Sequence, residues 1–162
     1  MVVISNTSPL LNLAIIDHLH LIEQQFGEIL IPSGVLKELR IDENLEGSPQ
    51  LQKAIKQGWI KVQEVQNKAF VQLLKRELDQ GETEAIALAI ELKADLILLD
   101  EREARRIART FDLKITGIIG IILKAWHQKK IISVKDLIDK LRTDAHFHIS
   151  PKLEQQILRE IE

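Results

Sequence analysis

The stretch GETEAIALAIELKADLILLDEREARRIA (residues 81–108) contains a helical segment, an apolar segment and a second helical segment in direct succession. Residues 82–92 place apolar side chains at the spacing of a helix, and residues 102–111 have the charged, amphipathic pattern of another. Between them, DLILL (95–99) is the clearest central strand, because a short apolar run is typical of a strand buried on both faces. This order predicts an α/β protein.

The same alternation continues on both sides of this stretch. We expect further strands at residues 2–5, 28–31, 59–65 and 114–116, with 59–65 at an edge of the sheet. We expect helices at 9–16 with Ser8 as N-cap, at 19–26, from 35 to 39, at 51–57, 69–78, 118–127 and 134–141, and at 153–161 with Ser150 as N-cap. Strands alternating with helices predict a mainly parallel central sheet covered by helices on both faces.

The composition is that of one ordinary globular domain. The chain has 162 residues, of which 45% are hydrophobic and 4% aromatic, so the core must be mainly aliphatic and no aromatic platform for stacking bases is expected. Cysteine is absent, which excludes disulfides and thiolate metal sites. No apolar run approaches the roughly 20 residues of a membrane span. The net charge of −2 argues against a protein that merely coats nucleic acid. A cytoplasmic protein is expected.

Polar and acidic side chains gather just after the predicted strands. In parallel sheets, ligands bind at the carboxyl ends of the strands, so these residues are expected to share one pocket. Several carboxylates in one pocket repel one another unless some are protonated or a cation neutralises them. Oxygen ligands without Cys or clustered His select Mg²⁺ or Mn²⁺, which can activate a water for phosphodiester hydrolysis. The candidate residues are Asn6, Thr7, Ser8, Glu38, Glu82, Glu84, Asp100 and Glu101.

Each of these residues also has a purely structural interpretation. Asp79 and Glu82 are spaced as a helix capping box, and Asp100 is placed to cap the following helix. Glu38 can be an ordinary solvated charge, and Asn6 and Ser8 can be turn and cap residues. Arg105 is a candidate contact for substrate phosphate, although a solvated or ion-paired helix face is the commoner explanation of such a residue. The shared position after strands therefore supports a site more than any single residue does.

Six blocks of the sequence, in order, resemble the PIN-domain family, in particular its bacterial and archaeal branch of unknown function. They are VVISNTSPLLNLA (2–14), IPSGVLKEL (31–39), GETEAIALA (81–89), LILLDEREARRIA (96–108), TGIIGIILKA (116–125) and a C-terminal stretch with ISPKLEQQIL (149–158). The resemblance covers nearly the whole chain, and GETEAIALA and LILLDEREARRIA are its most specific blocks. It implies an α/β/α sandwich over residues 1–162, with a C-terminal helical extension from about residue 131.

The resemblance also implies a function and a set of site residues. Many members are Mg²⁺- or Mn²⁺-dependent ribonucleases and toxins of toxin–antitoxin pairs, bound by a small antitoxin, and many form homodimers. Glu38 and Asp100 match the second and fourth acids of the family. Glu82 matches the third by its spacing to Asp100, with Glu84 as a close competitor. These residues and Asn6 are the expected metal ligands, and Thr7, Ser8 and Arg105 the expected substrate contacts.

Asn6 is the departure from the family pattern, which has Asp after the first strand. An Asn side chain offers a carbonyl oxygen to a metal ion but supplies neither negative charge nor a base. Two hypotheses therefore stay open: a metal-dependent endoribonuclease, and a catalytically weak module that acts by binding a partner protein or RNA. A doubly wound signalling domain with a phosphorylation pocket is a third reading, and the GETEAIALA block argues against it.

Overall fold

The computed structural model describes all of residues 1–162 and contains one five-stranded sheet in which every neighbouring pair of strands is parallel. The order across the sheet is β3-β2-β1-β4-β5. The strands are β1 Val3–Ser5, β2 Ile29–Ile31, β3 Ile60–Val62, β4 Leu96–Leu98 and β5 Ile115–Thr116. The α/β prediction and the edge position of residues 59–65 are confirmed. The middle strand is β1, with the DLILL strand (β4) beside it.

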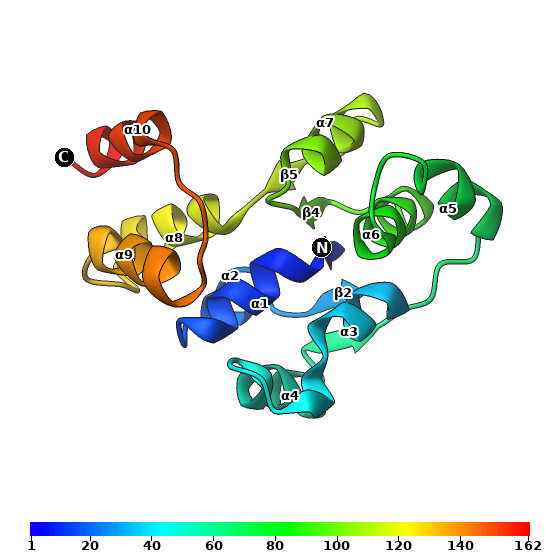
Figure 1. The fold of residues 1–162 in the computed structure, drawn as a ribbon, viewed down its shortest axis with the longest axis horizontal. Helices are drawn as coiled ribbons and strands as arrows, with labels where there is room; N and C mark the ends of the chain where they lie inside the picture. The colour runs from blue at the N-terminus through cyan, green and yellow to red at the C-terminus, as the bar shows by residue number, and fades with distance from the viewer.

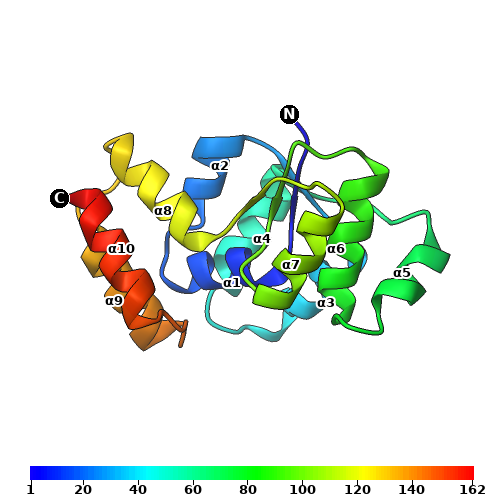
Figure 2. The same ribbon diagram turned by 90° about the horizontal axis from the view of Figure 1, so that it is seen from above.

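Ten α-helices flank the sheet (Figures 1 and 2). Helix α6 lies against β1 and β4, while α4 lies against β3, and α7 and α8 contact β5. The helices α8, α9 and α10 gather at one end of the molecule, and α5 lies at the other. The bounds are α1 Thr7–Ile15, α2 His20–Phe26, α3 Ser33–Leu39, α4 Ser48–Gln57, α5 Lys68–Leu74, α6 Gln80–Glu91, α7 Arg102–Thr110, α8 Ile118–His127, α9 Val134–Asp144 and α10 Pro151–Ile161. None of them combines the length and apolarity needed to cross a membrane.

The start of α1 differs from the prediction. The helix begins at Thr7, directly after the strand, and Asn6 occupies the N-cap position with an extended backbone but no side-chain cap hydrogen bond. Ser8, predicted as the N-cap, is therefore the second residue of the helix. Pro9 misled the prediction because proline is tolerated throughout a helix's first turn, where the backbone N–H has no intrahelical acceptor. As a consequence, Asn6, Thr7 and Ser8 all lie at the carboxyl end of the middle strand, β1.

Two predicted caps are confirmed. The Asp79 side chain accepts a hydrogen bond from the Glu82 backbone N–H at the start of α6, and the Glu82 side chain accepts one from the Asp79 N–H, which makes a full capping box. Ser150 accepts from the Leu153 N–H at the start of α10.

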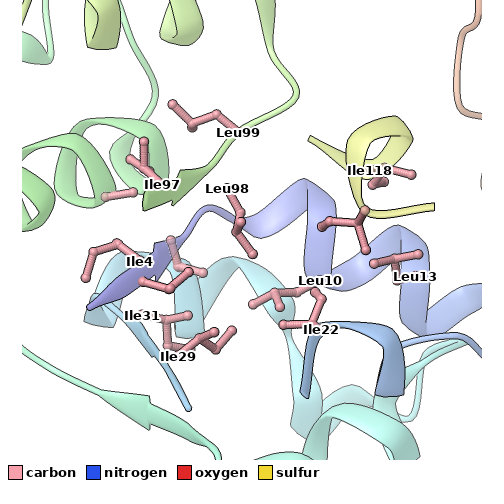
Figure 3. Close-up of a cluster of buried hydrophobic side chains, with 14 of the residues drawn as sticks. Ile4, Leu10, Leu13, Ile22, Ile29, Ile31, Ile97, Leu98, Leu99 and Ile118 are labelled. Carbon is pink, nitrogen blue, oxygen red and sulfur yellow. The ribbon is translucent and has the colours of Figure 1, made fainter. Parts of the chain in front are cut away.

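The core is a single cluster of 41 buried apolar residues, which are aliphatic as the composition predicts. Its centre is formed by side chains of β1, β2 and β4 with α1 and α8, as Figure 3 shows for Ile4, Ile31, Leu98, Leu10 and Ile118. Ile149 and Ile157 join the same cluster, so the C-terminal segment is packed against the rest of the domain.

The strand order places one reversal point in the sheet. From β1 the chain adds β2 and then β3 on one side, and later adds β4 and β5 on the other. At such a point the connections leave neighbouring strands in opposite directions, which opens a crevice at the carboxyl ends of those strands. Here these are the ends of β1 and β4, where Asn6 and Asp100 follow.

Candidate functional site

Asn6 is held at the end of β1 by the neighbouring strand. Ser5 pairs with Leu98 in register, and the Asn6 backbone N–H donates to the Leu98 carbonyl at 3.0 Å. The Asn6 side chain is only 3% exposed, yet its Oδ1 atom has no hydrogen-bond partner. A buried acceptor without a donor is costly, so this oxygen is suited to meet a cation or a water molecule.

Asp100 follows the neighbouring strand, two residues after the end of β4. Its Oδ1 accepts from the Ile118 backbone N–H at the start of α8 (2.9 Å), and its Oδ2 lies 3.5 Å from the Ser8 hydroxyl. Burial raises the pKa of Asp100 to about 6, although the Ile118 hydrogen bond and the positive charge of Arg105 oppose this. The prediction that Asp100 caps the next helix is wrong in detail, because it caps α8, not α7. The site therefore holds a carboxyl group that ionises near neutral pH.

Glu38, near the end of α3, reaches the residues that follow β1. Its Oε2 accepts from the Thr7 hydroxyl at 2.6 Å, and its Oε1 accepts from the Gly81 backbone N–H at 2.8 Å. Thr7 and its neighbour Ser8 thus contact Glu38 and Asp100 respectively. These contacts bring together residues that lie more than 30 and 90 positions apart in the chain.

Glu82 and Glu84 occupy different places on α6. Glu82 is 8% exposed, and burial raises its pKa, with a further contribution from the negative charges of Asp79, Glu101 and Glu38. Glu84 faces the start of α3, where its Oε1 accepts from the Gly34 backbone N–H at 3.2 Å. Glu82 thus lies within reach of the charges of Glu38 and Glu101 and also completes the capping box, while Glu84 lines the same cavity as Glu38.

Arg105, on α7, is half-buried beside Asp100, and its Nε atom has no hydrogen-bond partner. Its neighbour Arg106 is exposed and pairs with Glu103 and Glu77. The two arginines therefore differ: the charge of Arg105 acts on Asp100, whereas Arg106 pairs with exposed glutamates.

Two glycines at the site were not singled out by the sequence. A Cβ atom on Gly81 would lie 2.7 Å from the carboxyl carbon of Glu38, and one on Gly117 would lie 2.5 Å from Asp100 Oδ1. Both distances are far shorter than a normal van der Waals contact, so any side chain would displace an acid. In the sequence, these positions could have been recognised as glycines at the start of predicted helices, in the blocks GETEAIALA and TGIIGIILKA.

The donor set fits a hard divalent cation in its chemistry. It consists only of carboxylate oxygens and the free Asn6 amide oxygen, the ligands that Mg²⁺ and Mn²⁺ prefer. Burial raises the pKa of Asp100 and of Glu82 by disfavouring their charged forms, and a bound cation would stabilise those forms. However, no three His, Cys, Asp or Glu side chains are placed to hold one metal ion together. The side chains are therefore of the right chemical type for Mg²⁺ or Mn²⁺, but they are not arranged around a single ion.

Comparison with known proteins agrees with this architecture. The structure is similar to a PilT N-terminus domain protein from the hyperthermophilic archaeon Sulfolobus solfataricus P2, with a TM-score of 0.53, 17% sequence identity, and coverage of 77% of this chain and 93% of that one. At this identity the similarity concerns the fold alone. No curated protein matches the sequence. The family model described as "DUF3368: PIN domain" matches residues 2–162. The chain therefore belongs to the PIN-domain family.

Proposed function

We propose that the protein is a metal-dependent endoribonuclease that hydrolyses RNA phosphodiester bonds at the carboxyl ends of β1 and β4. PIN domains are generally nucleases, and they typically depend on a divalent metal ion. The observation that carries the proposal is the buried, unpartnered Asn6 Oδ1, which lies at the sheet's reversal point, where the partly buried Asp100 follows the neighbouring strand.

In this proposal Asn6, Glu38, Glu82 and Asp100 hold Mg²⁺ or Mn²⁺. When bound, the metal lowers the pKa of a water molecule and stabilises the charge that develops on the phosphate. Thr7 and Ser8 orient Glu38 and Asp100 through their hydroxyl groups. Arg105 supplies a positive charge for a substrate phosphate, because its guanidinium group is not engaged with an acid on its own helix as that of Arg106 is.

The experiment is RNA cleavage with and without Mn²⁺, comparing the wild type with Asp100→Asn. We expect metal-dependent cleavage that Asp100→Asn reduces by at least about 100-fold, since the variant removes charge from a metal ligand. Asp112→Asn is a matched control: Asp112 is exposed, and its φ of 59° is one that Asn adopts readily. Cleavage that persists in EDTA, or that Asp100→Asn leaves unchanged, would disprove the proposal.

The alternative is a catalytically weak module that acts by binding. Asn6 in place of Asp and the absence of a preassembled group of three acids both favour it. In that case calorimetry would detect no Mn²⁺ binding at millimolar metal, while a small protein encoded next to this one would bind tightly.

We further propose that the protein is the toxin of a toxin–antitoxin pair and a homodimer, which rests on membership of the family. Induced expression of the wild type should then arrest growth, and expression of Asp100→Asn should not. Light scattering should give twice the mass of the 18.5 kDa chain. Growth that continues unaffected by an active nuclease would contradict the toxin role.

A further inference from the structure

Glu84 is buried and lines the same cavity as Glu38, but its hydrogen bonds go to the start of α3. Its side chain is 6% exposed, and a buried carboxylate is stable only when donors surround it. The donors are the Gly34 backbone N–H at 3.2 Å, the Ser33 hydroxyl at 3.4 Å and the Gln80 side-chain amide. Two of these three donors belong to the first turn of α3, so Glu84 connects α6 to the start of α3.

Glu38 makes the connection in the opposite direction, from α3 to the start of α6. It is carried by α3, and it accepts from the Gly81 backbone N–H in the first turn of α6. Each helix thus sends one glutamate to the first turn of the other. Because the two contacts lie at different points along the helices, together they oppose both sliding and rotation of α3 against α6.

The two glycines at these contacts make room for the glutamates. A Cβ atom on Gly34 would lie 2.9 Å from the Glu84 carboxyl carbon, and one on Gly81 would lie 2.7 Å from that of Glu38. Neither glycine has a φ in the left-handed region, so alanine could adopt the backbone conformation of both. Space for the carboxylate, not backbone freedom, is therefore what each position requires.

We propose that Glu84 is a positioning residue: with Gly34, Gly81 and Glu38 it forms a reciprocal clamp between α3 and α6 that fixes the Glu38 carboxylate at the acidic cluster. Glu84 acts through hydrogen bonds to α3 and not as a metal ligand. The role of Glu38 in cleavage rests on the proposed function, whereas the clamp itself does not.

The first test compares Glu84→Gln with Glu84→Ala. Glutamine keeps an acceptor for the Gly34 N–H, so we expect Mn²⁺ affinity and kcat to stay within about threefold of the wild type. Alanine removes the acceptor, and loss of a residue that orients a ligand typically lowers metal affinity by about 10- to 100-fold. Equal losses in both variants would show that the charge of Glu84 matters, and would overturn the positioning role. A change in Tm alone, with Mn²⁺ affinity and kcat unaffected in Glu84→Ala, would also overturn it.

The second test needs neither metal nor RNA. Hydrogen exchange of the Gly81 amide, which donates to Glu38, should become at least about tenfold faster in Glu84→Ala and remain near the wild-type rate in Glu84→Gln. Unchanged exchange in Glu84→Ala would mean that Glu84 does not position Glu38.

The third test asks whether Gly34→Ala lowers or raises Tm when Glu84 is present and when it is absent. Gly34→Ala should lower Tm in the wild type, because the new Cβ displaces Glu84, but should leave Tm unchanged or raise it in the Glu84→Ala background, because alanine is the better helix former there. The same decrease in both backgrounds would overturn the clamp. If the wild type neither binds Mn²⁺ nor cleaves RNA, the proposed function fails, and the amide exchange and melting temperatures still decide the clamp.

Discussion

Replacing Asp100 by Asn should stabilise the metal-free protein at neutral pH while it lowers the proposed ribonuclease activity. Burial holds the pKa of this carboxyl group at about 6 in the folded protein, against 3.8 for the free side chain. Between these values the folded protein binds a proton that the unfolded chain has lost, so the free energy of unfolding falls as the pH rises. The loss is complete once the pH exceeds the folded pKa of about 6.

The size of the effect follows from the two pKa values. Their difference corresponds to about 3 kcal/mol at 1.36 kcal/mol for each tenfold change in the ionisation equilibrium. Solvent screens part of this because the carboxylate is only partly buried, so we expect a difference of about 1–3 kcal/mol. Asparagine keeps an acceptor for the Ile118 N–H and carries no charge, so it resembles the protonated acid.

The assay is urea denaturation of the wild type and the variant in EDTA, at intervals from pH 4 to pH 8. Taking the difference between the two proteins cancels the titration of the other groups that both share. Asp100→Asn should gain stability relative to the wild type as the pH rises from 4 to about 7, and the difference should then level off. A difference that stays constant across this range would refute the reasoning, because it would mean that Asp100 ionises normally.

Three further substitutions test other parts of the structure. Gly117→Ala should lower the free energy of unfolding by about 1–3 kcal/mol through overpacking against the same carboxylate, measured in urea. Gly120→Ala, in the helix α8 that Gly117 precedes, is its control, since the new Cβ would meet only a rotatable threonine side chain, and an equal loss would contradict the steric argument. Leu98→Ala, at a fully buried position of β4, should lower the free energy of unfolding by about 2–5 kcal/mol in the same assay. A decrease below about 1 kcal/mol would be inconsistent with its burial. Ser150→Ala should remove the cap of α10 and cost about 1 kcal/mol. Hydrogen exchange should then increase at the start of α10 and not in the sheet, and uniform exchange throughout would argue against a local cap.

The order of elements could be predicted from the sequence because it depends on short-range patterns. DLILL is apolar on both faces of a strand, and the flanking segments repeat apolar residues at helical spacing, so helix, strand and helix follow from residues 81–108 alone. The capping box at Asp79 and the N-cap at Ser150 were equally local. The start of α1 was missed because Pro9 is compatible with more than one position in a first turn.

The placement of the acids depended on the tertiary structure. The sequence showed that Glu82 and Glu84 are close in the chain and that either has the spacing for the site. It could not show which neighbours each would meet, because two residues separated by two positions point to different sides of a helix. The packing of α3 against α6 places Glu84 at Gly34 and Glu82 beside the charges of Glu38 and Glu101.

The sequence by itself therefore determined the α/β class, the position of Asn6 and Asp100 just after strands, and the aliphatic core, since these follow from residue type and periodicity. Only the tertiary structure decided that Asn6 and Asp100 follow neighbouring strands at the reversal point of the sheet, that Asp100 is buried enough to ionise near pH 6, and that Gly81 and Gly117 make room for the acids. The physical reason is that burial and close approach depend on contacts between residues that are distant in the chain, which local patterns do not encode.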